Sequence, residues 1–194
     1  MIMKKLSYLI IVLLVSVTGF SQTDTSLTRR LKEYTRLSKE LNFVELMEYM
    51  HPKLFDLAPK EQLIEIFRNV YDNEAMKITI EKLENRSISD PFTLNGVKYC
   101  KIDYHMVMNM KFKDDKLSDS TAINTMVSNL QEGLPGKEVS YDANGKQFVV
   151  KGSDVIIAIK DNPQTPWLFL GYDGKNEVVK KLFPEELIEH FKLQ

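Results

Sequence analysis

The sequence has little of the residues that form covalent or metal-bound centres. Among 194 residues there are one cysteine, one tryptophan and three histidines. A single cysteine, Cys100, excludes an intramolecular disulfide, so the domain must be held together by its hydrophobic core. His51, His105 and His190 share no spacing that is typical of metal ligands. We therefore expect neither a metal site nor a cofactor.

The sequence also has no large excess of basic or of acidic residues. The 26 basic and 27 acidic side chains are interspersed and give a net charge of −1. A chain without a basic surface field binds a phosphate backbone poorly, so we expect no nucleic-acid partner. With 43% hydrophobic and 27% charged residues, and with no linker rich in glycine or proline, the composition is that of one soluble domain.

The longest uninterrupted apolar run, residues 9–15, lies near the N-terminus. Lys4 and Lys5 precede this run, and Gly19-Phe20-Ser21 follows it as a small-x-small cleavage site. The pattern predicts a signal peptide over residues 1–21 and a single mature domain over residues 22–194. The alternative is an N-terminal membrane anchor, which is disfavoured because the apolar stretch is shorter than the ~20 residues that span a bilayer.

The position of Cys100 bears on where the exported protein resides. This residue lies far from the cleavage site, so no thiol at that site can carry a lipid anchor. We expect a periplasmic or secreted protein that is not a lipoprotein and that does not contact the membrane after cleavage. Removal of the two lysines of the signal changes the net charge to −3.

Apolar residues with helical spacing occupy residues 27–71, and two later segments show the same period. Asn42 is placed to cap a second helix, with Glu45 in the capping-box position, and Pro59 suits the first position of a third. The second helix should end before His51-Pro52, because proline disfavours helical geometry in the residue ahead of it. Helices are predicted over residues 27–41, 43–50, 59–71 and 120–130, and after Pro184.

From residue 76 the apolar period changes to 2, which predicts strands. Asn95-Gly96 suits a two-residue hairpin turn because both positions require positive φ, and Asn144-Gly145 is a second hairpin signal. The strand over residues 97–112 is about twice the usual length and should bend. One of its faces is apolar throughout, and consists of Cys100, Ile102, Tyr104, Met106, Met108, Met110 and Phe112. The other strands are predicted over residues 76–80, 139–141, 147–150, 155–159, 167–172 and 175–181.

Helices followed by long antiparallel strands predict an α+β domain, with N-terminal helices packed on a strongly curved, mainly antiparallel sheet and a short C-terminal helix. This order resembles the nuclear transport factor two-like, or cystatin-like, superfamily, which includes SnoaL-type cyclases, ketosteroid isomerase and scytalone dehydratase. More narrowly, small exported bacterial proteins of this fold are similar over residues 27–191. The phrases that carry this likeness are Leu41-Asn42-Phe43, residues 49–54, Gly96-Val97-Lys98-Tyr99 and Trp167-Leu168-Phe169.

The resemblance implies a cone, formed by the helices and the concave face of the sheet, whose mouth can hold an apolar ligand. Enzymes of the superfamily place acids, tyrosines and histidines inside this cone, but no motif of this chain aligns with a catalytic one. We expect a ligand to lie in a gap lined by Tyr34, Tyr49, Phe55 and Tyr71 on the helices and by Tyr104, Met106 and Met108 on the sheet.

Asp103 and His105 are the first candidates for catalysis. They lie two residues apart on one strand, so their side chains point the same way, and a carboxylate can orient an imidazole for general-base chemistry. Because they share their face with lysines and an asparagine, a solvated or subunit-facing surface is the favoured interpretation. Tyr104, on the opposite face, is a third candidate. For His51 we predict a role as a cap of backbone carbonyls, with a place at the pocket mouth as the alternative.

Three functions are compatible with these patterns. The favoured hypothesis is an exported, non-enzymatic binding or interaction module with an apolar pocket between helices and sheet. The first alternative is an isomerase or lyase that uses a tyrosine or an aspartate in the cone as acid or base. The second is a structural homodimer that associates through an exposed sheet face containing Tyr99, Val107 and Trp167.

Overall fold

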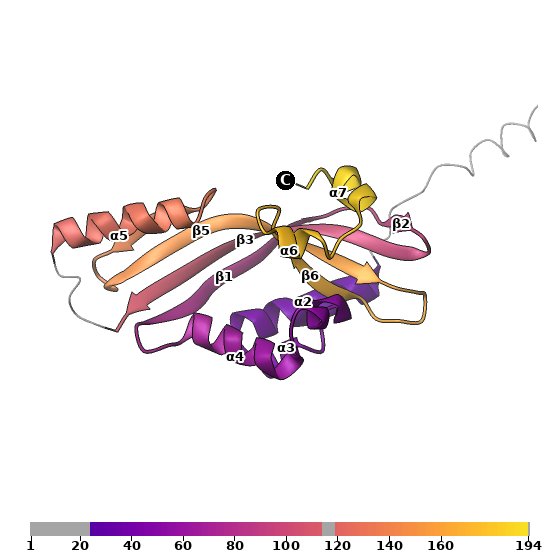
Figure 1. Ribbon diagram of the computed structural model, residues 1–194, viewed down its shortest axis with the longest axis horizontal. Coiled ribbons are helices and arrows are strands. Elements are labelled where there is room, and N and C mark those ends of the chain that lie inside the picture. The colour runs from indigo at the N-terminus through magenta and orange to yellow at the C-terminus, as the bar shows by residue number, and fades with distance from the viewer. Residues whose placement is uncertain (1–23, 114–118, 194) are drawn as a thin grey trace, which may run out of the picture.

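The fold is α+β, with one open six-stranded sheet in which all strand pairs are antiparallel (Figure 1). The structure is a computed structural model and describes residues 24–113 and 119–193. The predicted signal peptide, residues 1–21, lies outside the described residues. Of the helices in the described part of the chain, none is both long and apolar enough to cross a membrane.

Two long strands, β3 (Val97–Phe112) and β5 (Gln147–Lys160), pair with each other in the middle of the sheet. Two shorter elements share each outer edge. On one edge, β1 (Met76–Ile88) and β2 (Phe92–Leu94) both pair with β3. On the other, β4 (Glu138–Asp142) and β6 (Leu168–Tyr172) both pair with β5.

The turn between β2 and β3 confirms the hairpin predicted from Asn95-Gly96. Asn95 has φ of 51° and Gly96 has φ of 83°, and asparagine and glycine are the residues that tolerate these values best. The predicted length of the following strand is also confirmed, because β3 continues for 16 residues.

The helices α2 (Thr25–Lys39), α3 (Phe43–Leu46) and α4 (Lys60–Tyr71) lie on one side of the sheet (Figure 1). Spacings of four and three residues place one apolar stripe of α2 on a single face, which is buried. Burial of one such leucine stabilises the fold by about 2 kcal/mol. The stripe consists of Leu27, Leu31, Tyr34 and Leu37, and it packs against Cys100 and Ile102 of β3 and Ile156 and Ala158 of β5.

The short helix α3 begins as predicted but ends four residues early, at Leu46. Its cap is present, since the side chain of Asn42 accepts a hydrogen bond of 3.3 Å from the backbone of Glu45. Beyond α3 the chain runs beside β6. The N–H of Phe169 donates to the carbonyl of Tyr49 (2.8 Å), and the N–H of His51 donates to the carbonyl of Phe169 (2.9 Å). Because these backbone groups bond to the sheet, they cannot continue the helix. The 3-10 helix η1 (Pro52–Asp56) follows.

The apolar face of β3 is covered by two groups of helices. At its start, Cys100 and Ile102 pack under α2, and at its end Met110 packs under α5 (Ser120–Gly133). The residues of α5 that form this contact are Ile123, Met126, Val127 and Leu130. Tyr104 and Met106 lie on the stretch of β3 between the two covers.

The C-terminal segment differs from its prediction. Residues 175–181 were expected to form a strand, but they contain the short helix α6 (Glu177–Lys180). The cause is Asn176, whose side chain accepts hydrogen bonds from the backbone of Val178 (3.0 Å) and Val179 (3.2 Å) and so starts a helix. In Figure 1, α6 and α7 (Glu185–Phe191) lie on the side of the sheet away from α2. The buried residues Leu187 and Phe191 of α7 belong to one cluster with Tyr99, Ile157 and Ile159 of the sheet.

One prediction about β5 is corrected, and another, the hairpin with β4 around Asn144-Gly145, is confirmed by the antiparallel pairing of the two strands. The strands expected over residues 147–150 and 155–159 form one strand, because residues 151–154 stay paired with β3. The β4–β5 loop spans residues 143–146, and its positive φ of 48° falls on Lys146 rather than on Asn144 or Gly145. The side chain of Asp142 accepts a hydrogen bond of 3.0 Å from the N–H of Asn144, which favours this longer turn.

Candidate ligand-binding cavity

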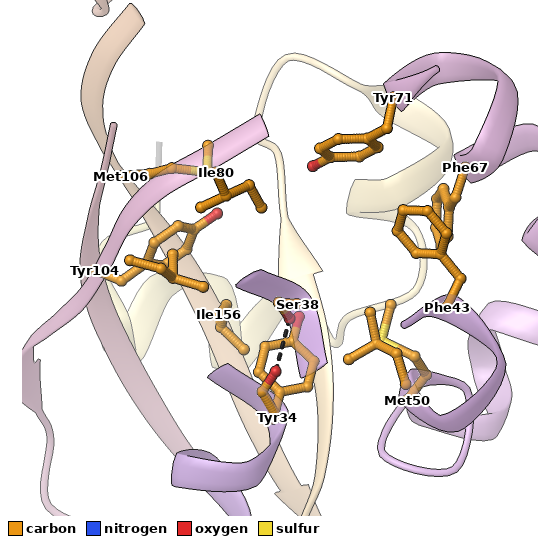
Figure 2. A pocket seen from close by; sticks show the side chains of 12 residues that line it. Tyr34, Ser38, Phe43, Met50, Phe67, Tyr71, Ile80, Tyr104, Met106 and Ile156 are labelled. Atoms are coloured by element: carbon orange, nitrogen blue, oxygen red, sulfur yellow. Dashed lines mark hydrogen bonds between the residues drawn. The ribbon is translucent and has the colours of Figure 1, made fainter. Parts of the chain in front are cut away.

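A cavity of about 170 Å³ lies where the N-terminal helices face the sheet (Figure 2). It occupies the region between the two helical covers of β3, where neither α2 nor α5 fills the space over Tyr104 and Met106. None of the residues around it carries a formal charge. The helical side contributes Tyr34, Ser38, Phe43, Leu46, Met50, Phe67 and Tyr71, and the sheet contributes Ile80, Leu83, Tyr104, Met106 and Ile156.

A β-bulge allows β1 to contribute two neighbouring side chains. Ile80 pairs with Met108, but the next pair joins Lys82 to Val107, so Glu81 is an extra residue in the strand. Such a bulge shifts the inward-facing side chains from even to odd positions. Leu83, which pairs with Met106, therefore faces the cavity together with Ile80.

Tyr34 forms one wall of the cavity from α2. Its ring centroid lies 4.7 Å from that of Phe169, and its side chain is 8% exposed. Burial raises the pKa of Tyr34 to about 12, although a hydrogen bond with the side chain of Ser38 offsets part of this effect. The Ser38 hydroxyl also donates a hydrogen bond of 2.8 Å to the backbone carbonyl of Tyr34.

Tyr71, at the end of α4, and Tyr104, on β3, direct their hydroxyls into the cavity from opposite walls (Figure 2). Burial raises the pKa of both phenols, and the carboxylate of Asp154 raises the pKa of Tyr104 further. Asp154 is the residue of β5 that pairs with Tyr104. Within residues 24–113 and 119–193, no hydrogen bond of either hydroxyl offsets these effects. Both groups are thus protonated donors at neutral pH.

The structure brings together four of the residues that the sequence places in a pocket: Tyr34, Tyr71, Tyr104 and Met106. The other three lie elsewhere. The ring of Tyr49 lies 4.1 Å from the guanidinium carbon of Arg30, outside the cavity. Phe55 is on η1, with the Lys60 ammonium 5.0 Å from its ring centroid, and Met108 packs in the cluster covered by α5.

Asp103 and His105 lie on the face of β3 that points away from the cavity. The carboxylate of Asp103 accepts a hydrogen bond of 2.6 Å from the Ser87 hydroxyl and lies 3.2 Å from the Lys101 ammonium. His105 pairs across the strands with Glu84. The bonds of Asp103 therefore go to Ser87 and Lys101 rather than to the imidazole.

His51 caps a helix in a different manner from the one predicted. It is 5% exposed, and its Nδ1 accepts a hydrogen bond of 3.3 Å from the backbone N–H of Lys53 at the start of η1. Its Nε2 lies 3.3 Å from the carboxylate of Asp161. Since Nδ1 is an acceptor, the ring proton resides on Nε2 and is donated to Asp161. The imidazole thus caps an N–H group, not carbonyls, and it does not line the cavity.

Two residues that the homodimer hypothesis placed on an exposed sheet face are buried within the chain. Tyr99 is 5% exposed because α7 covers it, and Trp167 is 1% exposed in the core beneath α2. Of the three named residues only the half-buried Val107 remains partly accessible.

Eight lining residues were not assigned to the pocket from sequence, namely Ser38, Phe43, Leu46, Met50, Phe67, Ile80, Leu83 and Ile156. Most belong to apolar stripes that are indistinguishable from ordinary core positions. Leu83 is the exception, because the break in alternation after Ile80 is a visible sign of a bulge.

No group of three or more histidine, cysteine, aspartate or glutamate side chains in the described chain is arranged to hold a metal ion. Cys100 is buried, and burial raises the pKa of its thiol to about 12, so it stays protonated. No protein-family model matches the chain, and no curated protein matches it either. The function must therefore be argued from the cavity.

Proposed function

We propose that the protein is an exported, non-enzymatic binding module that holds a small apolar ligand in the cavity between α2–α4 and the sheet. The observation that carries this proposal is the lining of a partly open cavity of about 170 Å³, which consists of twelve side chains, none of them charged. An apolar cavity of about 150 Å³ is large enough for benzene. The ligand is therefore a single ring or a short chain.

Filling the cavity removes apolar surface from water. The cavity is partly open to solvent, so a ligand that enters displaces water from its apolar walls. The ligand also gains contacts with those walls. Binding should therefore raise the thermal stability of the protein.

Two features support the fold family and the export that this proposal includes. The order of the elements and the open antiparallel sheet agree with a nuclear transport factor two-like fold, in which α2–α4 and a concave sheet face would enclose a cone. The signal sequence over residues 1–21 supports export to the periplasm or the extracellular space.

The binding proposal is tested by titrating the protein with toluene and observing the methionine methyl groups by NMR. Met50 and Met106 line the cavity, whereas Met126 packs between α5 and the sheet. We expect saturable shifts of the Met50 and Met106 methyl signals while the Met126 signal remains unchanged. Uniform shifts of all methionines, or none at saturating toluene, would contradict the proposal.

A matched pair of variants locates the binding site. Leu83→Phe places a larger side chain in the cavity and should weaken toluene binding at least tenfold. Leu57→Phe makes the same substitution at a position that is 42% exposed and outside the cavity, and should leave binding unchanged. If the two variants bind toluene with equal affinity, the binding site is not this cavity.

The alternative function is an isomerase or lyase. The observation that favours it is that the hydroxyls of Tyr71 and Tyr104 face the cavity and make no hydrogen bond with any described residue. Both phenols remain protonated, because burial raises their pKa, so they can act as acids but not as bases at neutral pH. No carboxylate, imidazole or amine lines the cavity to serve as the base. This lining favours binding over proton-transfer chemistry. If the protein is such an enzyme, Tyr104→Phe should abolish turnover, whereas Asp103→Asn, on the other face of β3, should leave it unchanged.

A further inference from the structure

We propose that the ligand carries a carbonyl oxygen, which accepts hydrogen bonds from the hydroxyls of both Tyr71 and Tyr104. This inference rests on the proposed function, since it names the chemical class of the molecule that the cavity holds. A small neutral ketone, aldehyde or ester meets the requirement, with its hydrocarbon part against Phe43, Phe67 and Met106.

The cavity presents two hydroxyl hydrogens to a ligand, and a carbonyl group is the acceptor that suits both. Tyr71 and Tyr104 each present one hydroxyl hydrogen to the same space, from opposite walls (Figure 2). A hydrocarbon ligand that displaces water from these hydroxyls would leave both hydrogens unpaired, which is costly. An alcohol that accepted both bonds would bring a third hydrogen into an apolar surrounding. A carbonyl oxygen has two lone pairs and no hydrogen, so it satisfies both donors.

The charges around the cavity exclude ionic ligands of comparable size. A carboxylate would find no basic side chain in the lining, and it would lie near the negative charge of Asp154, which pairs with Tyr104 across the strands. The positive partner of Asp154 is Lys137, which lies outside the lining. An ammonium group would find no acid in the lining. Burial of an unpaired charge costs several kcal/mol, so the ligand is neutral.

Three probes of nearly equal size and shape separate these possibilities: acetophenone, α-methylstyrene and benzoate. α-Methylstyrene replaces the carbonyl oxygen of acetophenone by a methylene group, and benzoate adds a negative charge. Affinities are measured from the Met50 and Met106 methyl signals on the intact protein. We expect acetophenone to bind about tenfold more tightly than α-methylstyrene, as two net hydrogen bonds would give. Benzoate should bind most weakly.

Single substitutions assign the effect to the two hydroxyls. Tyr71→Phe and Tyr104→Phe should each weaken acetophenone binding about threefold. Neither variant should weaken binding of α-methylstyrene, because each removes a donor that this hydrocarbon leaves unpaired. Tyr141→Phe is the control, because Tyr141 lies on β4, 5.1 Å from the ring of Phe148 and outside the cavity. This variant should bind all three probes as the unmodified protein does.

The outcomes distinguish this inference from the proposed function. If α-methylstyrene or benzoate binds the unmodified protein as tightly as acetophenone, the carbonyl assignment is wrong while the cavity remains a binding site. If neither these probes nor toluene binds, the proposed function itself is wrong. The ranking of the probes on the unmodified protein decides the question even if a tyrosine variant fails to fold.

Discussion

The indole Nε1 of Trp167 donates a hydrogen bond of 2.9 Å to the carboxylate of Asp24, and this bond joins the start of α2 to the core of the sheet. Asp24 also caps α2, because its other oxygen accepts a hydrogen bond of 2.9 Å from the N–H of Ser26. The ammonium of Lys160 lies 3.9 Å from the same carboxylate. One side chain thus fixes the helix that carries Tyr34 into the cavity.

Replacement of Asp24 should therefore destabilise the fold. Asp24→Ala removes the cap and leaves the buried indole N–H of Trp167 without its acceptor, at a combined cost of about 2 kcal/mol. Asp24→Asn keeps an oxygen that can cap the helix and should cost about half as much. Urea denaturation of both variants measures the difference. Equal losses would show that the charge, rather than the hydrogen bonds, carries the effect.

The same carboxylate makes the free energy of unfolding depend on pH in the acidic range. Hydrogen bonds from Ser26 and Trp167 lower the pKa of Asp24 from 3.8 to about 2. Because the pKa is lower in the folded state, this contribution is complete above about pH 4 and is lost as the pH falls to about 2. The side chain is 38% exposed, so solvent screening reduces the loss to about 1 kcal/mol. Unfolding free energies at about pH 5 and about pH 2.5 should differ more for the unmodified protein than for Asp24→Asn, which cannot titrate here.

Removal of one hydroxyl should stabilise the protein. Tyr172 on β6 is 9% exposed, and its hydroxyl is buried without a hydrogen-bond partner in the described chain. An unpaired buried hydroxyl costs about 1 kcal/mol or more. Tyr172→Phe retains the edge contact with Phe183, whose ring centroid lies 5.5 Å away, and should raise the unfolding free energy by about 1 kcal/mol.

Tyr141→Phe is the matched control for this gain. Tyr141 is half-buried at the edge of the sheet, so its hydroxyl can reach water and its removal should change stability little. If Tyr172→Phe were destabilising in urea denaturation while Tyr141→Phe were neutral, the Tyr172 hydroxyl would have a partner in solution.

Local patterns explain which parts of the fold the sequence predicts. The stripe of α2, the Asn95-Gly96 turn and the length of β3 are fixed by residues close together in the chain, and all three predictions are confirmed. The strand predicted at residues 175–181 fails for a local reason as well, because the cap by Asn176 outweighs the apolar alternation.

The cavity depends on contacts between segments that are far apart in the sequence, and no local pattern predicts these contacts. It exists because α2 and α5 cover different ends of β3, and the lengths of the intervening segments do not specify where each helix docks. The bulge at Glu81 depends on the register between β1 and β3, and it is this register that brings Leu83 beside Ile80. Tyr34, Tyr71 and Tyr104 could be predicted because tyrosines on apolar stripes are unusual, whereas Phe43 and Ile156 look like any core residue.

Gly152 of β5 provides a test of how Asp154 is held beside Tyr104. A Cβ atom added to Gly152 would lie 2.2 Å from Cδ of Lys137, so the lysine side chain would have to move. Lys137 donates a hydrogen bond of 2.7 Å to the carbonyl of Ser153 and is paired with Asp154. Gly152→Ala should therefore displace Lys137 and cost about 1 to 2 kcal/mol, although alanine is otherwise favoured over glycine in a strand.

A double-mutant cycle separates this clash from other effects of the alanine. In the Lys137→Ala background the side chain that obstructs the new Cβ is absent, so Gly152→Ala should be neutral or slightly stabilising. Unfolding free energies of the two single variants and the double variant give the coupling, which we expect to be about 1 kcal/mol or more. Additive losses would mean that the strand backbone, rather than Lys137, requires glycine at this position.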